Sequence, residues 1–234
     1  MLLEVDNIYT SYGLSRVLFG ISLYIDEGEV IALLGRNGVG KTTTLRSIMG
    51  LTPPHTGSVK WRGKEISGLP SYQIARLGIG LVPEDRRIFS DLTVWENLDV
   101  AKKATGPTEQ GWTVDRVFEL FPDLAKLSGR RGGNLSGGEQ QMLTIARTLM
   151  GNPKLCLLDE PSEGLAPIVV QRLAKQINKL KTEGLTILLS EQNSEFALDL
   201  SDRAYILEKG EIRYDGSVEE IMKDEDICRS FLTI

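Results

Sequence analysis

The apolar positions of the 234-residue chain fall into two kinds of pattern. Near the N-terminus, residues 2–8, 18–25 and 57–62 alternate or cluster as strands do, with glycine-containing and charged turns between them, which predicts an antiparallel β region. Residues 30–34 are uniformly apolar, which predicts a strand buried on both faces. Residues 41–49 then have helical spacing, so the chain passes from a β region into a strand-then-helix unit.

Further along the chain, predicted strands alternate with predicted helices. The strands are expected at 79–82, 154–158, 186–190, 203–208 and 211–214, and the helices at 71–77, 136–150, 167–183 and after Ser217. Residues 93–127 have a helical pattern that is interrupted at Thr105-Gly106-Pro107 and at Pro122, which predicts a helical insertion over approximately residues 90–130. Because strands that alternate with helices imply a mostly parallel core sheet, we expect an α/β fold in a single domain spanning residues 1–234.

Composition narrows the function classes only a little. A net charge of −5, with 41% hydrophobic and 25% charged residues, is ordinary for a globular protein and argues against a general nucleic-acid binder. Apolar runs stay well short of the roughly 20 residues that span a bilayer, so any membrane role is expected to come through a partner. The N-terminal residues have no signal-peptide pattern, and Cys156 and Cys228 have no metal-ligand spacing.

A glycine-rich segment lies between the buried strand at 30–34 and the following helix. Its sequence, Gly35-Arg36-Asn37-Gly38-Val39-Gly40-Lys41-Thr42, fits the phosphate-binding pattern G-x-x-x-x-G-K-[ST]. Glycines let backbone N–H groups wrap around phosphate oxygens, and the helix adds the positive end of its dipole. Lys41 supplies a cation for the β- and γ-phosphates, and the Thr42 hydroxyl is suited to bind Mg²⁺. The residues expected to bind the nucleotide here are Arg36, Asn37, Gly38, Gly40, Lys41, Thr42 and Thr43.

Two acidic residues follow the apolar run 155–158. Parallel sheets place ligand chemistry at the carboxyl ends of their strands, so this strand is expected to deliver carboxylates to the nucleotide site. Asp159 would hold Mg²⁺ through water, and Glu160 would polarise the attacking water. Taken alone, the two acids are equally consistent with a strand that ends in a turn at Pro161. The neighbouring phosphate loop favours the catalytic interpretation.

The segment Leu135–Gln141, with the sequence LSGGEQQ, has two compatible interpretations. Ser136 and Glu139 form the S-x-x-E pattern of a capping box, which begins a helix. A capped helix N-terminus that carries Gly137 and Gly138 also exposes N–H donors able to bind an anion. Because the phosphate loop already has its own donors, this second anion-binding helix end suggests a nucleotide held by another subunit.

The three segments resemble, in order and spacing, the ATPase subunits of ABC transporters, and the resemblance covers nearly the whole chain. It implies hydrolysis of ATP with Mg²⁺ and a head-to-tail dimer, formed with a second copy or with a related ATPase subunit. In such a dimer Ser136, Gly137, Gly138 and Glu139 would close over the partner's ATP. The resemblance further implies transmembrane permease partners at the cytoplasmic face of the cell membrane, contacted through the helical insertion and the Glu84 loop, and indirectly a solute-binding protein.

Three shorter segments resemble one branch of that family, the branched-chain amino acid importers of the LivF type. The segments that carry this resemblance are Val82-Pro83-Glu84, Glu163-Gly164-Leu165-Ala166-Pro167 and Ser190-Glu191-Gln192-Asn193. It implies import of branched-chain or other hydrophobic amino acids. Two other classes stay open: a soluble ABC ATPase, which usually has two ATPase halves or a long coiled coil, and a non-hydrolysing interaction module, which Lys41, Asp159 and Glu160 oppose.

The resemblance assigns Tyr12 to the aromatic residue that stacks on adenine, with Tyr9 as an alternative. Most relatives have glutamine at the position of Glu84, where it senses Mg²⁺ and the γ-phosphate. A glutamate there still offers an oxygen to Mg²⁺. The alternative interpretation is that Glu84 is a solvated loop residue without a role in the site.

Two other positions depart from the family pattern. Gln192 occupies the place of the switch histidine, where its amide would donate a catalytic hydrogen bond to the γ-phosphate without titrating near neutral pH. The single histidine, His55, is expected in a loop. Ala166 replaces an acidic residue, which puts part of the coupling between subunits in doubt, although Glu163 lies nearby.

Overall fold

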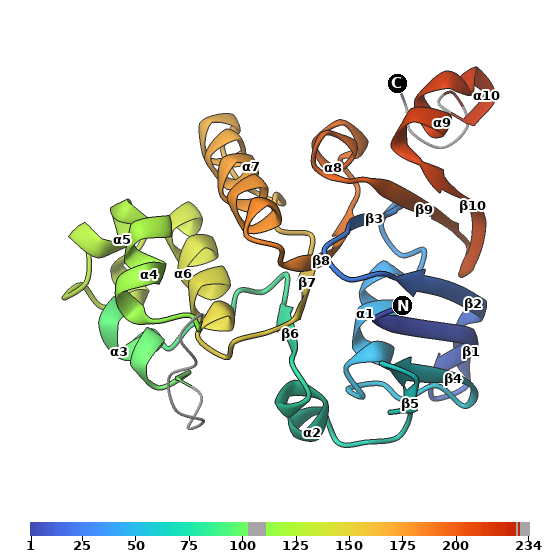
Figure 1. Ribbon diagram of the computed structural model, residues 1–234, viewed down its shortest axis with the longest axis horizontal. Helices are drawn as coiled ribbons and strands as arrows, with labels where there is room; N and C mark the ends of the chain where they lie inside the picture. Colours follow the sequence, from blue (N-terminus) through green and yellow to red (C-terminus); the bar gives the residue numbers. More distant parts are fainter. Residues whose placement is uncertain (103–110, 228, 230–234) are drawn as a thin grey trace.

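The computed structural model describes residues 1–102, 111–227 and 229 (Figure 1). Within them the strands form two sheets, and helices pack around the larger one. The predicted interruption at Thr105-Gly106-Pro107 and the residue Cys228 lie outside the described residues. No described helix combines the length and the apolarity that crossing a membrane requires.

The N-terminal sheet has the strand order β2-β1-β4-β5 and is antiparallel throughout, so the predicted antiparallel region is confirmed. Its strands are β1 (Leu3–Tyr12), β2 (Ser15–Ile25), β4 (Thr56–Trp61) and β5 (Lys64–Glu65). Strand β1 continues four residues beyond the predicted end. Asn7 has a φ of 49° and the register shifts around it, so the polar–apolar alternation breaks while the strand goes on.

The core sheet has the order β10-β9-β3-β8-β7-β6. Its strands are β3 (Val30–Leu34), β6 (Ile79–Val82), β7 (Leu155–Asp159), β8 (Thr186–Glu191), β9 (Arg203–Glu208) and β10 (Glu211–Ser217). Every neighbouring pair is parallel except β9 and β10, which confirms the mostly parallel sheet. The carboxyl ends of β3, β8, β7 and β6 therefore meet at one edge.

Helices pack around this sheet, and all but the last two of those named next connect strands. They are α1 (Lys41–Ile48), α2 (Ser71–Arg76), α6 (Gly137–Leu149), α7 (Pro167–Thr182), α8 (Ser194–Leu200), α9 (Val218–Lys223) and α10 (Glu225–Ile227). The helical stretch predicted from 93 to 127 contains, within its described part, the short helices α3 (Val94–Asp99), α4 (Val114–Leu120) and α5 (Pro122–Lys126). Phe121 leaves helical geometry with φ −118° and ψ 69°, and Pro122 then starts α5 at its first turn. Figure 1 shows α3–α6 gathered away from the N-terminal sheet.

The core lies on both faces of β3. Val30, Ala32 and Leu34 belong to the cluster that includes the buried residues of α6, α7 and α8. Ile31 and Leu33 belong to the cluster shared with α1 and the N-terminal sheet. Because successive side chains of a strand point to opposite faces, the uniformly apolar pattern reflects a strand that is covered on both sides. This packing holds the edge with the four carboxyl ends in place.

Candidate functional site

The phosphate loop runs from the end of β3 into α1. Gly35 and Gly40 have φ values of 156° and 115°, and a Cβ atom would lie 2.5 Å from the Leu207 carbonyl oxygen at the first and 2.6 Å from Leu18 Cδ2 at the second. Both positions combine positive φ with close packing, so the loop requires glycine there. Its shape follows from the neighbouring strands β2 and β9 as well as from its own sequence.

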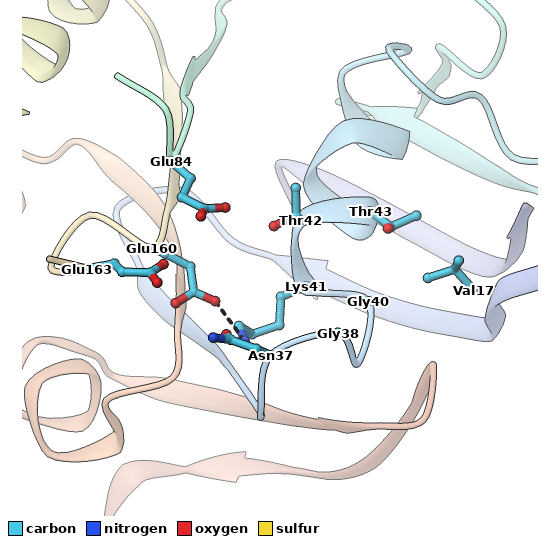
Figure 2. A pocket seen from close by; sticks show the side chains of 10 residues that line it. All are labelled: Val17, Asn37, Gly38, Gly40, Lys41, Thr42, Thr43, Glu84, Glu160 and Glu163. Atoms are coloured by element: carbon cyan, nitrogen blue, oxygen red, sulfur yellow. Dashed lines mark ion pairs between the residues drawn. The ribbon is translucent and has the colours of Figure 1, made fainter. Parts of the chain in front are cut away.

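Beside this loop lies a cavity of about 470 Å³ (Figure 2). Its lining residues come from the loop, α1, β2 and the segments after β6 and β7, and they are Val17, Asn37, Gly38, Gly40, Lys41, Thr42, Thr43, Glu84, Glu160 and Glu163. The structure thus brings together most of the residues predicted at the nucleotide site. Val17 and Glu163 were not assigned to it from the sequence. Arg36 is outside the lining and contributes its carbonyl group to the loop.

Lys41 is 3% exposed, and acceptors surround its amino group. Nζ donates hydrogen bonds to the Gly35 carbonyl at 2.7 Å and to the Arg36 carbonyl at 3.1 Å, and it lies 2.9 Å from Glu160 Oε1. Figure 2 shows the two side chains pointing toward each other across the cavity. A phosphate group that entered the loop would compete with the glutamate for this cation.

Glu160 follows β7 with a φ of 46°, in the left-handed region. Its backbone N–H donates to the Ser190 carbonyl at 2.9 Å, which fastens the turn to β8. The side chain is 8% exposed. A left-handed residue at a strand end costs about 1 kcal/mol, and here it redirects the chain so that the carboxylate faces Lys41.

Two of the expected magnesium ligands lie side by side. The Thr42 hydroxyl donates to Asp159 Oδ1 at 3.0 Å, and Asp159 is 3% exposed. Burial raises the pKa of Asp159 to about 6, the Thr42 and Ser190 side chains oppose this, and the charges of Glu84 and Glu160 add to it. A nearby cation would reverse the shift, because it favours the ionised carboxylate.

The described residues contain no group of three or more histidine, cysteine or acidic side chains able to hold a metal by themselves. Mg²⁺ does not require one, since it usually takes one or two protein oxygens together with phosphate oxygens and waters. The all-oxygen pair of Thr42 and Asp159, one of them a buried carboxylate beside the phosphate loop, fits that ion.

Three carboxylates, those of Glu84, Glu160 and Glu163, converge on the side of the cavity opposite Thr42 and Lys41 (Figure 2). Burial raises the pKa of Glu84, and the charges of Glu163 and Glu160 raise it further. This acidic wall disfavours a bare triphosphate and favours one that arrives with a divalent cation.

The capping box predicted at the start of α6 is confirmed. Ser136 Oγ accepts from the Glu139 N–H at 3.4 Å, and Glu139 Oε2 accepts from the Ser136 N–H at 2.7 Å. A Cβ atom on Gly138 would lie 2.6 Å from Val169 Cγ1, so α7 leaves no room for a larger residue. Ser136, Gly138 and Glu139 line a different cavity, of about 620 Å³, between α5, α6 and α7. Within one chain, this segment and the phosphate loop therefore line two different cavities.

Some predicted site residues lie apart from the first cavity. Tyr12 ends β1 with 47% of its surface exposed and is outside the lining, and Gln192 is exposed just after β8. Tyr9 lies along β1, with the Arg16 guanidinium 5.5 Å from its ring centroid. His55 is an exposed loop residue, as predicted.

Glu191 was assigned no role in the site from the sequence. This residue ends β8 and is 1% exposed, and its Oε1 accepts a hydrogen bond from the Ser162 N–H at 3.0 Å. Burial raises its pKa to about 7. The sequence signal for a buried carboxylate was an acidic residue directly after residues 186–190, a strand-like run without charged side chains.

Comparison with known proteins places this geometry in a family. Residues 18–163 match the ABC transporter family. The chain is 47% identical over 211 residues to the high-affinity branched-chain amino acid transport ATP-binding protein BraG of Pseudomonas aeruginosa, covering 90% of this chain and 91% of the relative. It is 38% identical over 235 residues to the lipopolysaccharide export system ATP-binding protein LptB of Haemophilus influenzae, covering 99% and 97%.

A solved structure gives the same result for the fold. The ADP conformation of MJ1267, an ATP-binding cassette of an ABC transporter, superposes with a TM-score of 0.81 at 26% identity, covering 97% of each chain. The predicted ABC ATPase fold and the resemblance to the branched-chain amino acid branch are both confirmed. The chain therefore belongs to the ABC transporter family and is an ATP-hydrolysing ATP-binding subunit.

Proposed function

We propose that this chain is the ATPase subunit of an importer for branched-chain or other hydrophobic amino acids. The ATPase part of the proposal rests on the joint arrangement of Lys41, Glu160, Thr42 and Asp159 at one edge of the sheet. The 47% identity to BraG supports the choice of solute. The similarity to LptB favours a second candidate, an exporter of lipid-like molecules.

In the proposed reaction the phosphate loop binds the β- and γ-phosphates through its N–H groups. The ion pair between Lys41 and Glu160 breaks, and Lys41 binds phosphate oxygens instead. Thr42 and Asp159 would hold Mg²⁺, which would supply positive charge to neutralise the phosphates. Glu160, released from the lysine, orients the attacking water through its carboxylate. Gln192 would donate to the γ-phosphate once closure brings it to the site, and Tyr12 would stack on the adenine.

We also propose that two ATPase subunits, identical or related, pair head-to-tail. The separation of the two cavities within one chain supports this arrangement, because the donors at the start of α6 then face a phosphate held elsewhere. Residues 136–139 of each subunit would complete the partner's site. Closure would be coupled to transport because the shared ATP binds the closed dimer preferentially.

The membrane contact is proposed for α2, α3 and the loop after β6. Large apolar side chains are exposed on these segments, among them Tyr72 at 57%, Phe89 at 50%, Trp95 at 48% and Val100 at 60%. Aromatic side chains, which three of these residues carry, are enriched at protein interfaces. In this proposal residues 1–234 form one ATPase domain with the helical insertion at about 90–130. It acts at the cytoplasmic face through permease subunits, serves a solute-binding protein indirectly and has no nucleic-acid partner.

The test is loss of function in the cell of origin. Disrupting the gene should abolish uptake of labelled leucine, isoleucine and valine, and expression of the wild-type chain, but not of Glu160→Gln, should restore it. Normal uptake together with accumulation of an unexported lipid at the inner leaflet would instead support the exporter.

A further inference from the structure

Glu191 occupies a position where an acidic side chain is costly. It is the last residue of β8, which lies between β3 and β7 in the core sheet, and it is 1% exposed. Burial of a carboxylate carries a desolvation penalty, and a neutral residue of similar size would avoid it. Stability alone therefore does not account for this residue.

The carboxylate is used to hold the segment that follows Glu160. Its Oε1 accepts the Ser162 N–H at 3.0 Å, and one strand position earlier the Ser190 carbonyl accepts the Glu160 N–H at 2.9 Å. The segment also folds on itself, since the Glu163 N–H donates to the Glu160 carbonyl at 3.1 Å. One backbone bond and one side-chain bond thus fasten this turn to the end of β8.

These two bonds link positions with different proposed roles. Glu160 is the proposed catalytic carboxylate, Gln192 directly follows Glu191, and the turn leads through Glu163 at the cavity edge to Ala166 at the start of α7. A shift of Gln192 toward a γ-phosphate would therefore act on the Ser162 backbone through Glu191. In return, a shift of the turn would act on Glu160.

We propose that Glu191 is a positioning residue for ATP hydrolysis, which holds the Ser162 backbone to the end of β8 so that Glu160 and Gln192 move as one unit. The inference rests on the proposed role of Glu160 and is independent of the solute carried.

The surroundings of Glu191 are consistent with a carboxyl group kept for hydrogen bonding. Its burial raises its pKa to about 7, hydrogen bonds from Ser162 and the Asn193 backbone oppose the shift, and the charge of Glu160 adds to it. An amide oxygen in the same place would accept the same N–H. The hydrogen bond, rather than the charge, is therefore the feature to test.

The experiment compares Glu191→Gln with Glu191→Ala in steady-state phosphate release. Glu191→Gln keeps the acceptor and should retain kcat within about twofold, whereas Glu191→Ala loses the bond and should lower kcat by up to about tenfold, the upper end of the worth of one ordinary hydrogen bond. The KM for MgATP should change less than about twofold in both, because the phosphate loop is untouched.

Asp202 offers a control at the other end of the sheet, since its Oδ2 accepts the Val30 N–H at 2.9 Å at the amino end of β3 and its Oδ1 pairs with Lys181. Asp202→Ala should lower the melting temperature while kcat stays at the wild-type value. The inference is overturned if Glu191→Ala keeps full kcat, if Glu191→Gln falls as far as Glu191→Ala, or if Asp202→Ala loses kcat equally. Hydrolysis that persists in Glu160→Gln would instead contradict the proposed site itself, which separates the two failures.

Discussion

The amino group of Lys41 lies 2.9 Å from Oε1 of Glu160, and the two side chains are 3% and 8% exposed. The cation of the phosphate loop is thus paired with the proposed catalytic carboxylate. In the proposed reaction, ATP replaces this pair before Glu160 acts on water. The contact holds both side chains in place, and it lowers the affinity for ATP because the ion pair has to break when ATP binds.

Replacement of Glu160 by glutamine should therefore have two effects. Hydrolysis should fall at least about a hundredfold because the carboxylate is lost. Affinity for ATP should rise about threefold to tenfold, because Lys41 is released and one negative charge leaves the acidic wall. Phosphate release and equilibrium titration with ATP measure the two quantities. Reduced hydrolysis with unchanged or weaker affinity would show that the ion pair does not compete with the nucleotide.

The same variant should expose the proposed dimer. With hydrolysis blocked, saturating MgATP should hold two subunits together through residues 136–139, and light scattering should report twice the monomer mass. The double variant Glu160→Gln with Ser136→Ala is the control, and it should dimerise more weakly. A monomer at saturating MgATP in the single variant would count against the head-to-tail arrangement.

Glu84 should make ATP binding more dependent on Mg²⁺. Its carboxylate lies with Glu160 and Glu163 on one side of the cavity, and burial together with their charges raises its pKa. Without Mg²⁺ this wall repels the phosphates, so Glu84→Gln should strengthen metal-free ATP binding severalfold and alter MgATP binding less. Titrating Mg²⁺ against ATP affinity in both proteins checks this, and superimposable curves would refute it.

Gln192 is exposed just after β8, and its proposed contact with the γ-phosphate needs closure of the two subunits. Gln192→Ala should lower kcat about tenfold while ATP affinity changes little, because the hydrogen bond forms only in the closed state. An amide does not titrate, so Gln192→His should introduce a new rate step between about pH 6 and 7 that the wild type lacks at this position. Unchanged turnover in Gln192→Ala would remove this residue from the site.

Stability should depend on pH through Glu191. Its pKa rises from 4.5 to about 7 on folding, so the folded chain binds this proton more tightly than the unfolded chain. The contribution to the free energy of unfolding is complete below about pH 4.5 and is lost as pH rises through about 7. Glu191→Gln stays neutral, so its stability relative to wild type should increase from pH 5 to pH 8, by at most about 3 kcal/mol. Urea unfolding at both values measures this, and a constant difference would contradict it.

Much of the fold follows from local patterns in the sequence. The uniform apolarity of residues 30–34 and 155–158 predicted buried parallel strands, and the pattern from Gly35 to Thr42 predicted the loop between strand and helix, because both depend on neighbours along the chain. The interruption of the helical stretch at Pro122 was also predicted, and it separates α4 from α5. The register shift of β1 around Asn7 was less visible, because the backbone there departs from regular geometry within a strand that continues.

The sequence by itself determined the chemical parts: a phosphate loop, two acids after a buried strand and a capped helix with two glycines. Only the tertiary structure decided which of them meet. It paired Lys41 with Glu160 and added Glu163 to the first cavity. It also placed Ser136 at a second cavity and buried Glu191, which accepts a hydrogen bond from the Ser162 N–H. These relations join strands and turns distant in sequence, and such contacts arise from the order of strands in the sheet, which no local spacing encodes.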